Sequence, residues 1–173
     1  MFVLSRDQTA QAVLPFDKNQ FADELAKQQI NKLYYSGQTG AGDELALSAQ
    51  SAVEGFDGQK TLEMRAVIAS IKGKNGLEIE ATAQFGQYLY SEKLLKMTGA
   101  VLISSSSGYQ LSSTELRILT DGTYIFGEGP IEGFSPIGNI YAGKMKIIRK
   151  NAAAQLQLWF GEKVVLDYEP GKI

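Results

Sequence analysis

The residue types that most often carry chemistry are partly missing from this sequence. Its 173 residues include neither cysteine nor histidine. Zinc, haem and iron–sulfur sites take their ligands mainly from these two residue types, and the common serine and cysteine nucleophiles depend on a histidine base. The composition therefore excludes these classes of metal site, cofactor site and catalytic site.

Two further patterns only imitate functional motifs. Glu78 and Glu80 would share one strand face, as a carboxylate pair in a glycan hydrolase could, but such side chains usually form a solvated face. The glycine-rich segment 37–42 is not followed by Lys-Thr, and Gly58-Gln59-Lys60-Thr61 has Val53 where a phosphate loop requires glycine. We therefore expect no enzyme, no catalytic residue, no metal and no cofactor.

The charged residues point away from nucleic acid. The formal net charge is -2 and the pI is near 5.3, whereas nucleic-acid binders usually carry a basic excess. In the basic run 144–150, Lys144, Lys146 and Lys150 would lie together if the run were a strand. They could meet phosphate groups, but an exposed strand whose lysines prevent edge aggregation is the favoured interpretation.

Short runs of alternating apolar and polar residues, separated by turn residues, make up most of the chain. Asp57-Gly58, Asn75-Gly76 and Asp121-Gly122 favour tight hairpin turns, and Ser104–Gly108 and Ser135-Pro136 favour looser ones. These signals predict one all-β domain with more than a dozen short antiparallel strands. No apolar stretch is long enough to cross a membrane, and Met1–Leu4 is too short for a signal-peptide core.

The alternation also predicts which side chains face inward. One predicted inward row is Leu77, Ile79, Ala81, Ala83 and Phe85, and another is Val164, Leu166 and Tyr168. Trp159 is expected to pack among the C-terminal strands. Residues 17–33 differ, because their apolar residues approach helical spacing behind Asp17; a first strand over Ile30–Tyr35 is the alternative.

Glycines recur at a nearly constant interval, which indicates an internal repeat. Gly42, Gly76, Gly108 and Gly138 are 34, 32 and 30 residues apart, and each precedes a similar apolar pattern. A second series interleaves with the first and contains Gly99, Gly129 and Gly161. Each repeat would therefore hold two strands, and stacked two-stranded units bury a continuous apolar interior while leaving an unpaired strand at each end.

The order of these motifs resembles the LptC family of lipopolysaccharide export, and its alphaproteobacterial branch most. The motifs are Gly42-x-x-Leu45-x-Leu47-x-Ala49, Asn75-Gly76-Leu77-x-Ile79-x-Ala81, Leu95-x-Met97-x-Gly99-x-Val101, Gly108-Tyr109-x-Leu111, Gly127-x-Gly129-Pro130-Ile131 and Pro136-Ile137-Gly138-x-Ile140-x-Ala142-Gly143-x-Met145. The resemblance runs from about Leu33 to Tyr168. LptA and the N-terminal domain of LptD share the fold, which makes this an LptA/OstA-like superfamily.

The resemblance implies an open β-jellyroll, bent like a taco, whose groove holds the acyl chains of lipopolysaccharide. The candidate groove residues are Ile79, Phe85, Met97, Val101, Leu111, Ile118, Phe126, Ile140, Met145, Leu158, Phe160 and Val164. The family-motif glycines are Gly76, Gly99, Gly108, Gly129 and Gly138. The implied division of the chain is an N-terminal segment, 1–32, that follows a missing membrane anchor, and a β-jellyroll domain, 33–173.

The resemblance also implies partners. A non-enzymatic carrier would receive lipopolysaccharide from the inner-membrane transporter formed by LptB, LptF and LptG at its N-terminal edge. It would pass the lipid to LptA at a C-terminal edge that contains Val164, Leu166 and Tyr168. The implied location is the periplasm, with an N-terminal helix in the inner membrane that this sequence lacks. The same edges could instead pair two copies of the chain in a homodimer.

Two other classes of function remain open at this stage. A carbohydrate-binding β-sandwich would need exposed aromatic residues, for which Tyr88, Tyr90, Tyr109 and Tyr141 are available, although no calcium-like cluster of aspartates accompanies them. A glycan hydrolase with paired carboxylates is the least favoured class, because no pair stands out from the sequence.

Overall fold

The computed structural model describes residues 30–55, 60–120, 124–149 and 156–168. These residues form ten strands: β1 (Ile30–Gln38), β2 (Glu44–Glu54), β3 (Thr61–Lys72), β4 (Glu78–Leu89), β5 (Leu94–Ser105), β6 (Gln110–Leu119), β7 (Tyr124–Ser135), β8 (Gly138–Ile148), β9 (Gln157–Gly161) and β10 (Val165–Tyr168). They make one open antiparallel sheet, which confirms the predicted all-β class.

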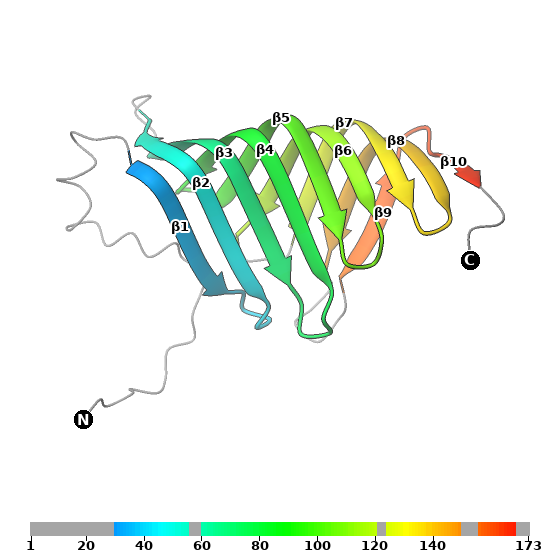
Figure 1. The fold of residues 1–173 in the computed structure, drawn as a ribbon, viewed down its shortest axis with the longest axis horizontal. Helices are drawn as coiled ribbons and strands as arrows, with labels where there is room; N and C mark the ends of the chain where they lie inside the picture. The colour runs from blue at the N-terminus through cyan, green and yellow to red at the C-terminus, as the bar shows by residue number, and fades with distance from the viewer. Residues whose placement is uncertain (1–29, 56–59, 121–123, 150–155, 169–173) are drawn as a thin grey trace.

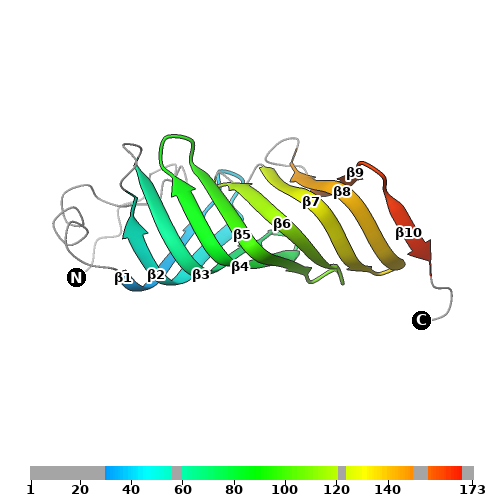
Figure 2. The ribbon, with the colours of Figure 1, turned by 90° about the horizontal axis from the view of Figure 1, so that it is seen from above.

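The order of strands in the sheet follows the order in the chain. From β1 to β8, each strand pairs with the next strand in the chain. On its other side, β8 pairs with β9 along one half of its length and with β10 along the other half. Figures 1 and 2 show the resulting row of strands, from β1 at one end to β10 at the other. The sheet therefore has two distinct ends that are not joined to each other.

Three of the predicted turns, at Asn75-Gly76, Ser104–Gly108 and Ser135-Pro136, lie within the described residues and are confirmed. Asn75-Gly76 lies in the β3–β4 hairpin, where Gly76 has a φ of 82°, and Gly108, with a φ of 93°, lies in the β5–β6 hairpin. Glycine reaches this left-handed region without the clash that a Cβ would cause. The predicted turns at Asp57-Gly58 and Asp121-Gly122 lie outside the described residues.

The described residues form fewer strands than expected, ten rather than more than a dozen. Eight of the ten described strands have 9 to 12 residues, so the structure has fewer and longer strands than the turn signals suggested. The reason is that most strands continue through a sharp bend that the sequence could not distinguish from a strand end. The two-strand unit that the glycine spacing predicted is present, because Gly42, Gly76, Gly108 and Gly138 lie at the starts of β2, β4, β6 and β8.

The N-terminal end of the sheet decides between the helix and the strand that the sequence allowed for residues 30–33. β1 begins at Ile30 and pairs with β2 from its first residue, Ile30 opposite Ala52. Residues 30–33 therefore belong to a strand, which was the alternative to the helix expected over 17–33; the rest of that range lies outside the described residues. Within the part of the chain that the structure describes, no helix is long and apolar enough to cross a membrane.

A line of unusual backbone conformations crosses the sheet near the middle of its strands. Residues with positive φ on this line are Lys32 in β1, Ala66 in β3, Gly99 and Ala100 in β5, and Gly129 in β7. The register shifts in the same region in the four strand pairs from β4–β5 to β7–β8. Bulges bend the strands that contain them, so this line, which we call the crease, folds the sheet into two facing walls.

The crease also interrupts the simple alternation of inward and outward side chains. In an unbroken strand, buried residues are two apart. In β3, β6 and β8 the buried residues on either side of the crease are three apart: Met64 and Val67, Ser113 and Leu116, and Ala142 and Met145. The interior therefore stays on the concave side of both halves of each strand.

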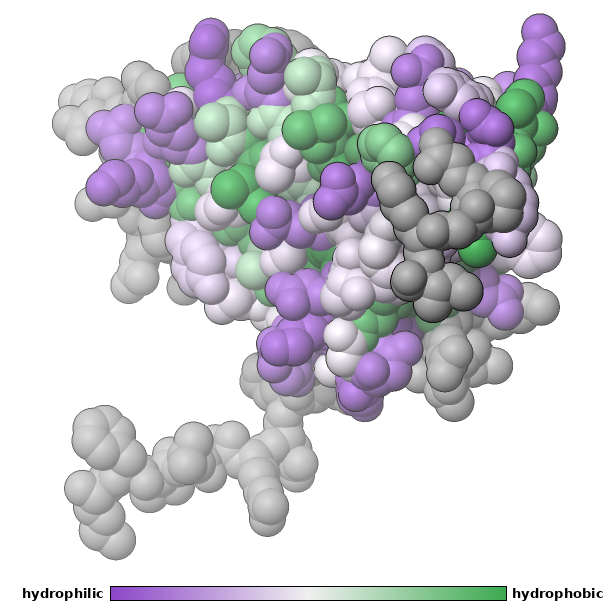
Figure 3. Space-filling view, turned by 45° about the vertical axis from the view of Figure 1, so that its right-hand side comes forward, coloured by the Kyte–Doolittle hydropathy of each residue, from purple (hydrophilic) through white to green (hydrophobic). Residues whose placement is uncertain are grey.

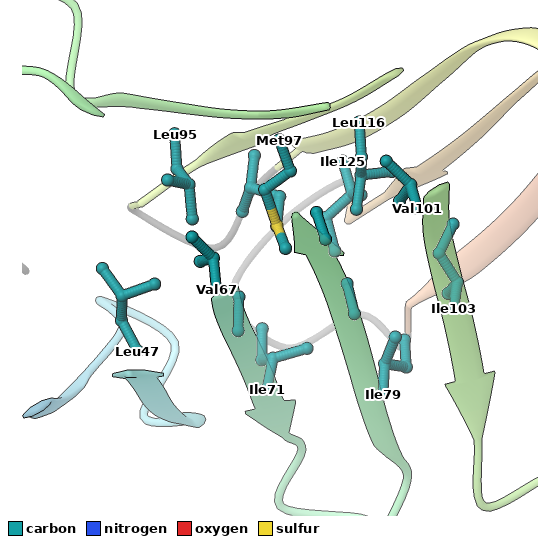
Figure 4. Close-up of a cluster of buried hydrophobic side chains, with 14 of the residues drawn as sticks. Leu47, Val67, Ile71, Ile79, Leu95, Met97, Val101, Ile103, Leu116 and Ile125 are labelled. Atoms are coloured by element: carbon teal, nitrogen blue, oxygen red, sulfur yellow. The ribbon is translucent and has the colours of Figure 1, made fainter. Parts of the chain in front are cut away.

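The apolar core lies between the two walls. The first wall contains the strand halves that meet at the hairpins of residues 39–43, 73–77 and 106–109, and the second wall contains the other halves together with β9. Figure 4 shows Leu47, Ile71 and Ile79 of the first wall opposite Leu95, Met97 and Ile125 of the second. Side chains buried in this way stabilise the fold by roughly 1.5–3 kcal/mol each.

Candidate functional site

The interior between the walls contains a narrow apolar cavity of about 30 Å³. The first wall contributes Tyr35, Leu45, Leu47, Ile71, Ile79 and Ile103, and the second wall contributes Leu95, Leu116, Ile118, Ile125 and Ile147. Side chains of both walls are needed, so the cavity exists only because the crease brings the two halves of each strand face to face.

A second cavity, of about 210 Å³, adjoins the first. Both cavities are lined by Ile79, Ile103 and Ile147, and we call the two cavities together the slot. The second cavity reaches half-buried residues at the edges of the walls, such as Leu77 and Tyr109 on one side and Leu156 on the other. The slot therefore opens between the β3–β4 and β5–β6 hairpins and β9.

Most of the predicted groove residues lie on the inner side of the sheet. Seven of them are buried there: Ile79, Met97, Val101, Leu111, Ile118, Ile140 and Met145. Leu158 and Phe160 are half-buried and pack against the core from β9. Of these nine, five line the slot itself: Ile79, Leu111, Ile118, Met145 and Leu158.

Phe85 lies outside, contrary to the inward row predicted for it. The ring is 47% exposed, and the guanidinium carbon of Arg65 lies 5.8 Å from its centre. The row is correct as far as Ala83; the register then shifts between Thr82 and Phe85, at the crease. The residues that point inward beyond this shift are Gly86 and Tyr88.

Phe126, Val164 and Trp159 also differ from the prediction. Phe126 points outward and stacks on Tyr124 at 6.1 Å, because its neighbour Ile125 occupies the inward position. Val164 is half exposed because it lies in the bend between β9 and β10, so it does not line the slot. Trp159 is 49% exposed on the outer side of β9.

The sequence missed several residues that line the slot, chiefly Ile103 and Ile147. A usable signal was present for both. Ile103 follows Val101 by two residues, and Ile147 follows Met145 by two, so the alternation places each on the same face as a predicted groove residue.

A buried ion pair joins the two walls near the slot. Asp43, just before β2, accepts a hydrogen bond from the Arg149 guanidinium, just after β8, at 2.6 Å. The Thr39 hydroxyl also lies within hydrogen-bonding distance of the Asp43 carboxylate, at 3.3 Å. The side chains of Asp43 and Arg149 are 1% and 10% exposed, so this contact holds the first hairpin against the end of β8.

Both ends of the sheet present a strand with one unpaired side within the described residues. β10 pairs only with β8, and all four of its residues are exposed. Leu166 and Tyr168, two of the predicted edge residues, lie in this strand, and Val164 directly precedes it. β1 lies at the opposite end and pairs only with β2.

The outer face of the second wall carries alternating charges. Glu115 of β6 forms ion pairs with Lys96 of β5 and Arg117, and Arg117 also contacts Glu128 of β7. Burial by itself would raise the pKa of Glu115, but hydrogen bonds from Lys96 and Arg117 outweigh it and lower that pKa below its ordinary value. Figure 3 shows another face of the molecule, on which polar residues lie between apolar patches.

The features that suggested other functions are dispersed or buried. Glu78 and Glu80 are exposed on the outer face of β4, and among the residues that the structure describes no group of three acidic side chains could hold a metal ion. Of the four tyrosines considered for carbohydrate binding, Tyr88 is buried, Tyr90 and Tyr109 pack against the core, and Tyr141 is 46% exposed. Burial raises the pKa of Tyr90 to about 12, with further contributions from the nearby Glu54 and Tyr88.

The comparisons with known proteins agree with this architecture. No curated protein matches the sequence. The sequence model of one family, described as "Lipopolysaccharide-assembly, LptC-related", matches residues 42–158, a range that begins just before β2 and ends within β9. The match covers more than half of the chain and contains nearly all the residues that line the slot. The chain therefore belongs to the LptC family, whose members take part in lipopolysaccharide transport.

Proposed function

We propose that this chain is a non-enzymatic periplasmic carrier whose slot holds the acyl chains of lipopolysaccharide. The observation that carries the proposal is the pair of adjoining apolar cavities between the walls, the second of which reaches the edge formed by Leu77, Tyr109 and Leu156. Each methylene group that moves from water into such a space contributes about 0.8 kcal/mol. An opening at the edge would let the sugars remain in water while the chains are buried.

The two free strands support the second part of the proposal, a bridge between membrane and partner. An unpaired strand edge binds an extended segment of another protein through main-chain hydrogen bonds. β10 would pair with LptA, and β1 would face the inner-membrane transporter formed by LptB, LptF and LptG. In the absence of these partners, the same edges would pair two copies of the chain.

Photo-crosslinking tests the slot with a matched pair of positions. Ile103 lines the slot and is 5% exposed, whereas its neighbour Leu102 points outward and is 58% exposed. A benzophenone amino acid at position 103 should capture lipopolysaccharide in cells, and the same residue at position 102 should capture little. A second pair, Leu158 and Trp159, repeats the test on the other wall.

The control outcomes separate a lipid carrier from a carbohydrate-binding domain. Equal labelling at both positions of each pair would contradict the slot as the lipid site. Competition by free fatty acid, with none by the soluble core oligosaccharide, is expected if acyl chains provide the affinity. The opposite pattern would favour a carbohydrate-binding surface.

A further inference from the structure

The buried ion pair between Asp43 and Arg149 is unusual because it joins the two walls and leaves polar atoms unused. Asp43 Oδ1 and Arg149 Nε are both buried and have no hydrogen-bond partner among the described residues. A buried charge is stabilised only when its donors and acceptors are well used. Among the described residues, one carboxylate oxygen of Asp43 and the Nε–H of Arg149 have no partner. The carboxylate therefore engages fewer N–H donors of Arg149 than an anion that binds through two oxygens would.

The pair lies at the edge of the slot. Leu45 is two residues from Asp43 along β2, Ile147 is two residues from Arg149 along β8, and both line the slot. Since alternate residues of a strand share a face, Asp43 and Arg149 continue these two inward rows toward the edges of the walls. A chain that occupied the slot would therefore carry its polar end close to Arg149.

A second cation lies near this point. A Cβ at Gly42 would come into contact with the side-chain end of Lys74, so the ammonium group of Lys74 is close to the residue before Asp43. Guanidinium groups bind phosphate through two parallel N–H donors, and lysine adds a point charge. Arg149 and Lys74 together suit an oxyanion better than they suit a neutral group.

We propose that the Asp43–Arg149 pair is an exchangeable latch. A phosphate group on an amphiphile whose chain enters the slot replaces the Asp43 carboxylate on Arg149, and this releases the first hairpin from the end of β8. The inference rests on the proposed function, because burial of the chain delivers the phosphate to Arg149. It deepens that function by naming the residue that binds the phosphate and the contact that the phosphate releases.

Native mass spectrometry of the full chain can test the latch with three probes: dodecyl phosphate, dodecyl glycerol and inorganic phosphate. The two amphiphiles share a chain of the same length and differ in charge. We expect the wild-type protein to bind dodecyl phosphate about tenfold more tightly than dodecyl glycerol, as a charge-assisted hydrogen-bond pair would give. Inorganic phosphate should not compete, because it has no chain to bury.

Variants of Asp43 and Arg149 test whether this ion pair is the source of the preference for dodecyl phosphate. Arg149→Gln should lose the tenfold preference and keep its affinity for dodecyl glycerol, whereas Asp43→Asn should bind dodecyl phosphate more tightly than the wild-type protein. Arg117→Gln is the matched control, because Arg117 is also ion-paired but lies on the outer face; its preference should be unchanged. The double variant Asp43→Asn/Arg149→Gln carries no buried charge, so it tests the preference even if a single variant fails to fold.

The outcomes distinguish the latch from the slot. If dodecyl glycerol and dodecyl phosphate bind equally to the wild-type protein, or if the double variant keeps the preference, the latch is wrong and the slot stands. If neither amphiphile binds, the proposed function itself fails. If inorganic phosphate displaces dodecyl phosphate at equal concentration, Arg149 belongs to a site for free phosphate and the exchange is overturned.

Discussion

Thr114 of β6 lies so close to Gly129 of β7 that a side chain at position 129 would collide with its hydroxyl group. The Thr114 hydroxyl donates a hydrogen bond of 2.8 Å to the carbonyl of Glu128, and Gly129 has a φ of 92°. These two residues mark the crease between the strands where the register shifts. At this point of the crease, a side chain at position 129 would both clash with Thr114 and require a left-handed backbone conformation.

We first predict that Gly129→Ala destabilises the protein by about 1–3 kcal/mol, because alanine there must accept a left-handed backbone and displace Thr114. Urea denaturation monitored by circular dichroism measures the change. Gly40→Ala is the control, since a Cβ at Gly40 meets nothing within 4 Å. If both variants had wild-type stability, the crease would not depend on Gly129.

The second prediction concerns the ion pair between the walls. Asp43→Ala should cost about 3–5 kcal/mol of unfolding free energy, because it leaves the Arg149 guanidinium buried without its partner. Glu128→Ala removes a partner of Arg117 at the surface and should cost no more than about 1 kcal/mol. Thermal and urea unfolding of both variants provide the comparison. Equal losses of unfolding free energy would show that the buried Asp43 pair stabilises the protein no more than the surface pair does.

The third prediction concerns the free edge at β10. Successive N–H groups of a strand point to opposite sides in the plane of the sheet, so of Val165 and Leu166 one donates toward β8 and the other toward the free edge. Proline removes the donor. One of Val165→Pro and Leu166→Pro should therefore lose binding to an LptA partner while the fold keeps its stability.

Hydrogen exchange at Ile140 and Tyr141, the residues of β8 opposite Leu166 and Val165, identifies which proline variant keeps the β8–β10 pairing. Binding of the partner is then measured by surface plasmon resonance. If both proline variants bind the partner with wild-type affinity, β10 is not the docking edge.

The fourth prediction is a pH dependence that originates at Glu115. Its pKa is lowered from the ordinary value of about 4.5, so its carboxylate stabilises the folded state above that pH. This contribution is lost as the pH falls below about 4.5 and through the lowered pKa. The wild-type protein should therefore be more stable than Glu115→Gln near neutral pH, and the difference should shrink in acid.

Unfolding free energies at several pH values between about 7 and 3 give this difference directly. Glu80→Gln, at an exposed position of β4, serves as the control and should follow the wild-type curve. A constant difference between Glu115→Gln and the wild-type protein across this range would contradict the assignment to Lys96 and Arg117.

The sequence by itself determined the class of fold, the two-strand unit and most of the inner face. Alternation in β4 from Ile79 to Ala83 and the turn at Asn75-Gly76 are local properties, and local geometry is enough to interpret them. The recurring glycines at 42, 76, 108 and 138 marked the start of every even strand up to β8 for the same reason.

Only the tertiary structure decided which residues line the slot. The outward position of Phe85 follows from a bulge that changes the phase of alternation within β4. The contact between Asp43 and Arg149 joins residues 106 positions apart, and it forms because the crease turns one half of the sheet over the other. The residue pattern of a strand indicates which side chains share a face. The bending of the sheet depends on the register between neighbouring strands, and the pattern of one strand does not determine that register.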